Sequence, residues 1–210
     1  VAPYEADAQL AYFSRSGYVD IVITEDSDMI PYGCSTVLYK LNPSTGVCDI
    51  YRAQDLTLTP FGIDVSLFLI QSVCIISGCD YLEGLYGIGL KKALTMIKKC
   101  STPEQVVATV QRLYKKDIPD NYLELFKNAM FTFNHQYIYD TEQQDVFFLT
   151  EMKEPVSQEL CDSVLGKKPT KEQAILIAQG EIDPNTLQRF ITTDETFVHS
   201  QQSKTILSML

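Results

Sequence analysis

Apolar positions change their spacing along the chain, from strand-like runs in the first eighty residues to helix-like periods after them. Residues 18–24 (YVDIVIT) form a β-branched run that ends in an acidic segment, which predicts a buried strand followed by a loop. Residues 37–41 and 47–51 flank the turn-forming segment 42–46 (NPSTG), so a β-hairpin is predicted there.

Helical signals lie before, between and after these strands. Residues 6–12 predict a helix that is entered after Pro3. Residues 63–76 are apolar on most sides and predict a buried helix that ends at 77–80 (SGCD). We also predict helices over 90–99, from 103 to about 114, from 119 to about 134, over 171–179 and over 184–190, and a short strand over 147–149.

The order of these elements predicts an α/β core that continues into a mainly helical lobe. The chain has 210 residues, of which 45% are hydrophobic and 21% are charged, as expected for a globular protein of one or two domains. This composition excludes collagen-like, disordered and disulfide-scaffold chains. The tail after residue 193 is polar and has no clear period.

Signals for membranes and secretion are not found in the sequence. No window approaches the roughly 18 to 20 uninterrupted apolar residues that a membrane helix needs. Residues 1–5 (VAPYE) have neither the basic nor the apolar region of a signal peptide. We therefore expect an intracellular protein without a membrane partner. The first residue is not Met, which is consistent with a piece of a longer polypeptide.

The cysteine pattern does not predict a metal site. The six cysteines form no C-x-x-C pair, and His135 and His199 are the only histidines that could complete a zinc site. We therefore expect reduced, packed thiols, including Cys79. We also expect His135 to pack at the end of a helix.

Three acidic clusters adjoin apolar runs that we expect to be buried. Glu5 and Asp7 lie at the start of the first predicted helix, Asp26 and Asp28 follow the predicted strand, and Asp80 follows the long helix. In an extended chain, a spacing of two puts both side chains on one face. Ligands gather beyond the carboxyl ends of strands in open α/β sheets. Taken alone, however, each cluster is more typical of helix caps and solvated turns.

Five carboxylates gathered in one place would require cations. If the carboxylates lie within about 6 Å of one another, the two members of each close pair repel each other by roughly 2 to 3 kcal/mol at an effective dielectric near 20. Ligand sets made only of oxygen select Mg²⁺ or Mn²⁺. Two such ions, about 3.5–4 Å apart, can polarise a phosphodiester and activate a water. The acidic clusters therefore predict a two-metal site.

Charge is distributed unevenly along the chain. The net charge of −10 argues against a nucleic-acid partner for the chain as a whole. Residues 81–118, in contrast, hold seven Lys and Arg against three Asp and Glu, which makes them +4. This pattern is typical both of phosphate binding and of an ordinary turn before a solvated helix. The segment includes three glycines before a helix and two lysines in its first turn: Gly84, Gly87, Gly89, Lys91 and Lys92.

Together these motifs resemble those of a known family, the flap endonuclease/exonuclease 1 family of structure-specific 5′ nucleases. The resemblance covers most of residues 1–192 and looks closer to exonuclease 1. It is carried by four ordered segments and supported by two later ones: 1–9 (VAPYEADAQ), 23–29 (ITEDSDM), 77–82 (SGCDYL) and 87–93 (GIGLKKA), then 132–136 (TFNHQ) and 174–180 (AILIAQG).

The resemblance implies a nuclease that hydrolyses DNA from a 5′ end or at a 5′ flap. Its two Mg²⁺ or Mn²⁺ ions would be held by residues that match five of the family's seven metal-site carboxylates: Glu5, Asp7, Asp26, Asp28 and Asp80. The other two carboxylates, with a strand and a helical arch, would lie in an N-terminal half outside this chain. We therefore expect the isolated chain to be inactive or nearly so.

The resemblance also implies how the chain is divided. Residues 1–80 would be the carboxyl-terminal part of a PIN-like nuclease core with parallel strands, here incomplete. Residues 81–118 would form a helix-two-turn-helix, and residues 119–210 would form a helical lobe that packs back on the core.

In the family, the helix-two-turn-helix holds duplex DNA through a bound K⁺. By analogy, the Ser77 hydroxyl and the carbonyls of Gly84 and Ile88 would bind that ion. Two residues depart from the family pattern, because Gly84 stands where Ser is usual and Tyr86 where Arg is usual. The first change is expected to be harmless, whereas the second removes a cation.

Partners and location follow from the resemblance as expectations. The substrate would be duplex DNA with a 5′ end, nick, gap or flap, and the protein partners would be the N-terminal half and mismatch-repair proteins in the nucleus. One alternative is a non-catalytic duplex-DNA-binding module with a vestigial acidic cluster. Another is a metal-dependent phosphatase or phosphotransferase acting on small molecules, in which the basic stripe at 91–116 has no purpose.

Overall fold

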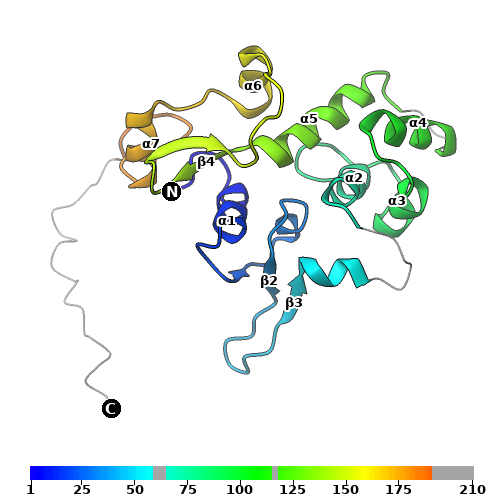
Figure 1. Cartoon of the computed structure of the whole chain (residues 1–210), viewed down its shortest axis with the longest axis horizontal. Coiled ribbons are helices and arrows are strands. Elements are labelled where there is room, and N and C mark those ends of the chain that lie inside the picture. Colours follow the sequence, from blue (N-terminus) through cyan, green and yellow to red (C-terminus); the bar gives the residue numbers. More distant parts are fainter. Residues whose placement is uncertain (59–64, 115–117, 191–210) are drawn as a thin grey trace.

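A small mixed sheet forms the centre of the first part of the chain. The computed structural model describes residues 1–58, 65–114 and 118–190. Strands β1 (Val22–Ile23), β2 (Thr36–Tyr39) and β3 (Asp49–Arg52) lie in that order, with β1 parallel and β3 antiparallel to β2 (Figure 1). The predicted α/β class with a parallel strand pair is confirmed.

The first strand is shorter than the β-branched run 18–24 predicts. Val22 and Ile23 pair with β2, and Val22 belongs to the same buried cluster as Ala8 and Ala11. Ile23, in contrast, is 60% exposed. In the described sheet β1 is an edge strand, so the prediction of a buried strand is right for Val22 and wrong for Ile23.

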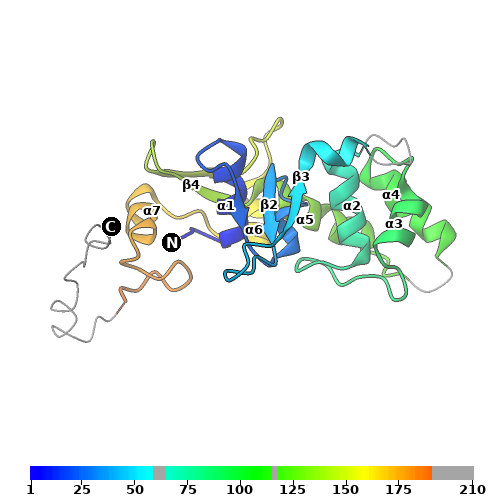
Figure 2. The same cartoon turned by 90° about the horizontal axis from the view of Figure 1, so that it is seen from below.

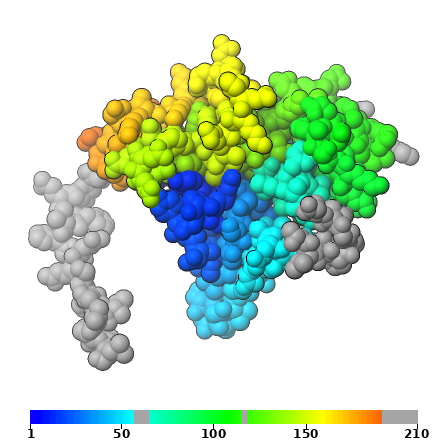
Figure 3. All heavy atoms as spheres, viewed as in Figure 1, coloured from blue at the N-terminus to red at the C-terminus, as the bar shows by residue number. Residues whose placement is uncertain are grey.

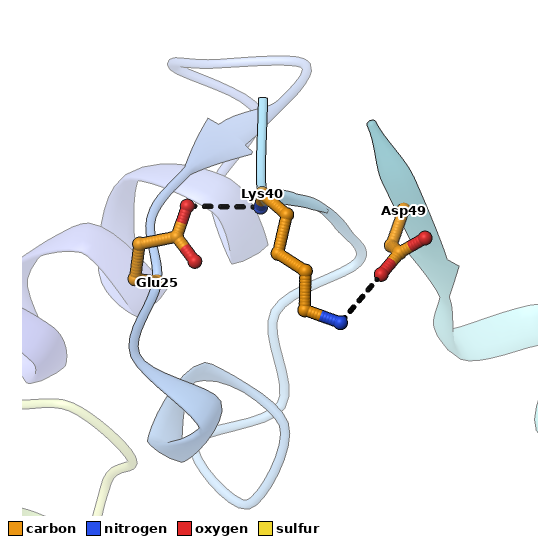
Figure 4. A network of polar contacts seen from close by, with 3 residues as sticks. All are labelled: Glu25, Lys40 and Asp49. Carbon is orange, nitrogen blue, oxygen red and sulfur yellow. Dashed lines mark hydrogen bonds and ion pairs between the residues drawn. The ribbon is translucent and has the colours of Figure 1, made fainter. Parts of the chain in front are cut away.

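The hairpin of β2 and β3 confirms the predicted turn at 42–46. The side-chain oxygen of Asn42 accepts a hydrogen bond from the Ser44 N–H at 2.9 Å, as in an Asx turn. At the turn end of the hairpin, the Lys40 N–H donates to Glu25 Oε1 and the Lys40 ammonium donates to Asp49, both at 2.9 Å (Figure 4). The Glu25 bond therefore ties the acidic loop after β1 to the hairpin.

Helices are the main regular elements in the rest of the described chain. Four of them begin with a side-chain cap that accepts the N–H three residues later, from Ser66, Thr102, Ser157 and Thr170. The helices are α1 (Ala6–Arg15), α2 (Leu67–Ser77), α3 (Leu90–Ile97), α4 (Pro103–Leu113), α5 (Tyr122–His135), α6 (Gln158–Leu165) and α7 (Lys171–Ala178), with 3-10 helices η1 (Ser27–Met29) and η2 (Ala53–Leu58).

Most predicted helices are confirmed with shifts of a few residues at their ends. Helix α2 begins after the Ser66 cap rather than at residue 63, a position that lies outside the described residues. The predicted helix 184–190 is wrong. There, Asp183 Oδ1 accepts the N–H of both Asn185 and Thr186 at 2.8 Å and folds the segment into a turn.

Apart from the two short 3-10 helices, one strand and one helix of the described chain were not predicted. Strand β4 (Tyr137–Asp140) directly follows α5 and pairs with β5 (Asp145–Phe148), so the strand expected over 147–149 is half of a second hairpin. Helix α6 also lacked a prediction. Residues 193–210, where a polar tail was predicted, lie outside the described residues.

One buried cluster connects the sheet to the helices. It extends from Ala8 in α1 through Val37 in β2 and Ile76 in α2 to Phe133 in α5. Helices α2, α3, α4 and α5 pack together at one end, and α1 lies against β4 (Figures 1 and 2). In the space-filling view, the blue N-terminal atoms lie between the sheet and the yellow-green atoms (Figure 3). The segments from α1 to Leu149 therefore share one core, whereas Tyr137, Val146, Leu165 and Ala174 form a second cluster. The domain boundaries at 80 and 118 stay predictions.

A buried pair of amides reinforces this core. Gln71 of α2 donates to the backbone carbonyl of Pro31 at 3.0 Å and pairs with the amide of Asn134 in α5 through two bonds of 3.2 Å. Because Gln71 is only 2% exposed, leaving any of these groups unpaired would be unfavourable. The pair therefore fixes α2 and α5 relative to the segment after η1.

The turn that joins α2 to α3 depends on the close approach of two glycines to backbone. Gly78 has a φ of +110°, in the region that favours glycine. A Cβ added to Gly84 would lie 2.2 Å from the carbonyl oxygen of Ser77. The usual Ser at this position could not be accommodated in this conformation without a shift of the backbone.

We predict that Gly84→Ser destabilises the folded chain by about 1–3 kcal/mol, because the new Cβ overlaps a backbone carbonyl. Gly89→Ser is the matched control: Gly89 is the N-cap of α3 with a φ of −98°, and no atom lies within 4 Å of an added Cβ. It should leave stability unchanged or raised by a few tenths of a kcal/mol. Equal stability of the two variants in thermal unfolding would contradict this prediction.

Candidate metal centre and nucleic-acid interface

The first acidic pair lies where α1 begins. Glu5 is the N-cap residue of α1 and has extended backbone angles, but its side chain makes no capping bond. Asp7 lies in the first turn and is half-buried. Because the Glu5 carboxylate is not used to cap the helix, it is available for contacts elsewhere.

The second pair follows β1, in a different geometry from the one predicted. Asp26 is extended and caps η1, where its Oδ1 accepts the Asp28 N–H at 2.8 Å. Asp28 lies inside this 3-10 turn, so the two side chains are not on one face of an extended segment. The turn, rather than strand alternation, keeps Asp28 near Asp26.

Asp80 lies in the tight turn after α2. The Cys79 and Leu82 backbones exchange two hydrogen bonds of 3.1 and 3.3 Å around it, which closes the turn. The carboxylate is exposed. The bend after Gly78 therefore presents Asp80 at the surface next to the end of α2.

Electrostatic coupling shows that the five carboxylates share one region. Burial raises the pKa of Asp7 from 3.8 to about 6, with further contributions from Asp26, Glu5 and Asp80. Burial also raises the pKa of Asp28 to about 6. Repulsion from the other four carboxylates raises it further, in the order Asp26, Asp80, Asp7 and Glu5. The structure thus brings the three predicted acidic clusters into mutual electrostatic reach.

This coupling affects stability. Because both pKa values exceed 3.8, the unfolded chain loses these protons first as pH rises from about 4 to about 6. The folded state is destabilised over that range, and the destabilisation is fully present above pH 6. Protonation or a bound cation would relieve it.

Within the described residues, no basic side chain neutralises the cluster. Their ion pairs are Lys40–Asp49, Lys127–Glu104 and Arg189–Glu181, all elsewhere. In the same residues, no three acidic, histidine or cysteine side chains lie close enough to hold one ion. The donor set and its uncompensated charge fit Mg²⁺ or Mn²⁺, and binding would require the mutually repelling side chains to draw closer.

Sequence reasoning missed the residues that contact Glu5. Tyr32, Tyr81 and Gln136 all donate hydrogen bonds to Glu5 Oε2. Tyr81 and Gln136 lie in segments that carry the family resemblance, which is the signal that could have drawn attention to them. The partners of their side chains could not be foreseen from the sequence.

The glycine loop leads directly into the first turn of α3. Gly87 has a φ of +76°, and its carbonyl accepts a hydrogen bond from the Lys92 ammonium at 3.1 Å. Gly89 is the N-cap of α3 and has no side chain. The first backbone N–H groups of α3 therefore receive no hydrogen bond from a capping side chain. The hydroxyl of Ser77 is buried and has no hydrogen-bond partner in the described structure, as a ligand reserved for an ion would be.

The basic residues around this loop are solvent-exposed. Lys91, Lys92, Lys98 and Lys99 are exposed on or after α3, and Arg112 is exposed on α4. Lys115 and Lys116 belong to the predicted stripe but lie outside the described residues. A cavity of about 590 Å³ is lined by both an acidic and a basic residue of these groups; its lining includes Asp28 of η1, Ser77 at the end of α2, its C-cap Gly78, and Lys91 of α3.

The remaining candidates pack as predicted. His135 Nδ1 bonds the carbonyl of Thr150 at 2.7 Å, and its ring lies against Phe131 and Phe148 at the end of α5. All six cysteines are free thiols, and burial raises the pKa of Cys79. In the described part of the chain, no helix has the length and apolar character needed to cross a membrane.

Comparisons with curated proteins agree with this arrangement. Residues 1–80 match the XPG I-region family. The chain is 36% identical over 191 residues to exonuclease 1 of Arabidopsis thaliana, covering 89% of this chain and 25% of that protein. It is 37% identical over 195 residues to exonuclease 1 of Oryza sativa subsp. japonica, covering 90% and 22%. The chain therefore spans about a quarter of the length of these curated relatives.

Solved structures show the same fold. Flap endonuclease-1 from Methanococcus jannaschii matches with a TM-score of 0.51 and 19% identity over 83% of this chain and 49% of that chain. The Holliday junction-resolving enzyme GEN1, in complex with product DNA and a Mg²⁺ ion, matches with a TM-score of 0.50 and 23% identity over 68% and 40%. Together, the matches in sequence and fold show that the chain belongs to the flap endonuclease/exonuclease 1 family.

Proposed function

We propose that this chain is part of a divalent-metal-dependent, structure-specific 5′ nuclease that acts on DNA in repair. One observation carries the proposal: three separate segments bring five carboxylates into one region without a compensating cation among the described residues. The relatives named exonuclease 1 support the reaction class. The substrates would be duplexes with a 5′ end, nick, gap or flap.

Each group of residues has its own task in this proposal. Mg²⁺ or Mn²⁺ bound at the cluster would supply an activated water and stabilise charge on the scissile phosphate. The carboxylates bind and orient the ions: Glu5, Asp7, Asp26, Asp28 and Asp80. No side-chain nucleophile is needed, which agrees with the raised pKa of the nearby Cys79 thiol.

The loop between α2 and α3 would hold the duplex by its backbone. Lys91 and Lys92 are exposed at the start of α3, where helix amides favour phosphates. The unpartnered Ser77 hydroxyl supports a K⁺ ion at this turn, with the carbonyls of Gly84 and Ile88 as further ligands. We further propose that the full-length protein acts in the nucleus with mismatch-repair proteins.

A second candidate is a non-catalytic duplex-DNA-binding module with a vestigial acidic cluster. It is favoured by the observation that no three carboxylates in the described residues are close enough to hold one ion. Divalent-ion binding separates the two candidates.

We predict that Asp26→Asn and Asp28→Asn each weaken Mn²⁺ binding by at least about 10-fold, because each removes a charged oxygen ligand. Calorimetric titration of the natural full-length protein measures this directly. Asp49→Asn is the matched control, since Asp49 is an exposed carboxylate paired with Lys40. Unchanged Mn²⁺ affinity in both cluster variants would favour the non-catalytic module.

We predict little or no cleavage by the isolated 210-residue chain in Mg²⁺. The family's other two metal-site carboxylates and its helical arch are not among the residues that match here. The chain and the natural full-length protein should be assayed side by side on 5′-flap, nicked and recessed duplexes. Equal turnover by the two would refute the prediction.

We predict that Lys91→Ala combined with Lys92→Ala weakens duplex binding equally for all sequences. The slope of log affinity against log salt should become shallower by about 0.9 for each phosphate that these lysines no longer neutralise. Binding is measured in EDTA, so that cleavage cannot interfere. The control is Lys167→Ala with Lys168→Ala, another exposed lysine pair, in the loop after α6. A salt slope identical to that of the unsubstituted protein would show that the DNA interface does not include these lysines of α3.

A further inference from the structure

Three donors from distant parts of the sequence converge on one oxygen of Glu5. The Tyr32 hydroxyl donates to Oε2 at 3.3 Å, and the Tyr81 hydroxyl and the Gln136 amide make shorter bonds to the same atom. Tyr32 follows η1, Tyr81 follows Asp80, and Gln136 ends α5. Glu5 is thus joined to two of the elements that carry the other acidic residues and to the carboxyl end of α5.

The network has five contacts but four hydrogens, one on each tyrosine hydroxyl and two on the Gln136 amide, so the single Tyr32 hydrogen serves either Glu5 Oε2 or the Tyr81 oxygen. The Gln136 amide donates one hydrogen to Glu5 and the other to the Tyr81 oxygen at 2.9 Å. Tyr81 donates to Glu5, and the Tyr32 hydroxyl also contacts that of Tyr81. The donors therefore point toward Glu5 as their final acceptor. Among the hydrogen bonds of the described chain, none ends on the other carboxylate oxygen, Oε1.

The donors are held rigidly. Gln136 has no exposed surface; its N–H donates to the Thr132 carbonyl at 3.2 Å, and its carbonyl accepts from the Leu149 N–H at 2.9 Å. The rings of Tyr32 and Tyr81 both pack edge-on against Phe133, with centroids 5.2 and 5.0 Å from that of Phe133. The junction of α5 and β4 therefore determines where these donors lie.

An ordinary core position would not need this arrangement. The side-chain carbonyl of Gln136 is buried without a hydrogen-bond partner in the described structure, which is unfavourable because the oxygen has given up its water. An apolar side chain of similar volume would avoid that loss. What the amide contributes instead is two directed hydrogens, one to Glu5 and one to the hydroxyl beside it.

We propose that Gln136 and Tyr81 are positioning residues: they hold the Glu5 carboxylate by Oε2 and leave Oε1 free to bind a divalent cation. The inference rests on the proposed function of the acidic cluster. It assigns to the α5–β4 junction, 131 positions away in the sequence, control over the first metal-site residue. Partners of this kind, behind a metal ligand, typically change metal affinity by 10- to 100-fold.

The test is Mn²⁺ binding to the natural full-length protein, measured by calorimetry without DNA. Gln136→Met and Tyr81→Phe should each weaken Mn²⁺ binding by roughly 10- to 100-fold. In a Glu5→Gln background, Gln136→Met should cause no further loss, because the group it positions is gone. The matched control is Tyr122→Phe, since Tyr122 is a buried tyrosine whose hydroxyl has no partner in the described structure.

The outcomes separate this proposal from the proposed function. Affinities within about twofold of the unsubstituted protein would overturn the positioning role, as would an equal loss from Gln136→Met with and without Glu5. If Asp26→Asn still weakens Mn²⁺ binding in that case, the metal site stands and only the positioning role falls. If Gln136→Met fails to fold, Tyr81→Phe and the same Glu5→Gln cycle carry the test.

Discussion

Repulsion among carboxylates is the constraint on which the first part of this structure depends. Three segments bring Glu5, Asp7, Asp26, Asp28 and Asp80 into mutual electrostatic reach, and burial combines with this repulsion to raise the pKa of Asp7 and Asp28 to about 6. At neutral pH, the described residues provide no ion pair that relieves the charge. The fold must therefore hold groups that push one another apart, and a divalent cation is the partner that would convert this repulsion into attraction.

Polar contacts made by α5 and its C-cap residue help to hold these segments together. Gln71 and Asn134 connect α2 and α5, and Gln71 also bonds the segment after η1. Gln136, at the end of the same helix, bonds Glu5. Each of these bonds lies in or beside the main buried cluster, where leaving a polar group unpaired is costly. The acidic residues lie early in the chain, but part of their support comes from residues beyond 130.

The separation of charge would allow an acidic chain to bear the proposed surface for DNA. The net charge is −10, yet the charged side chains exposed at the start of α3 are lysines. At physiological salt, electrostatic effects decay within about 8 Å, so the sign of the local surface matters more than the total. Lys91 also lines the cavity that Asp28 lines. A phosphate backbone held at α3 could thus approach the acidic cluster without crossing a wholly acidic face.

The sequence by itself determined much of the local structure and the acidic character of the candidate site. The turn at Asn42, the caps at Ser66 and Thr102, and the acidic residues beside apolar runs all depend on near neighbours in the chain. The strand β4 and helix α6 were missed, and the signal of Pro184 for a helix was outweighed by the turn at Asp183. Only the tertiary structure decided that Tyr32, Tyr81 and Gln136 meet on Glu5, because these contacts span up to 131 positions and exist only once α5 has packed against α2.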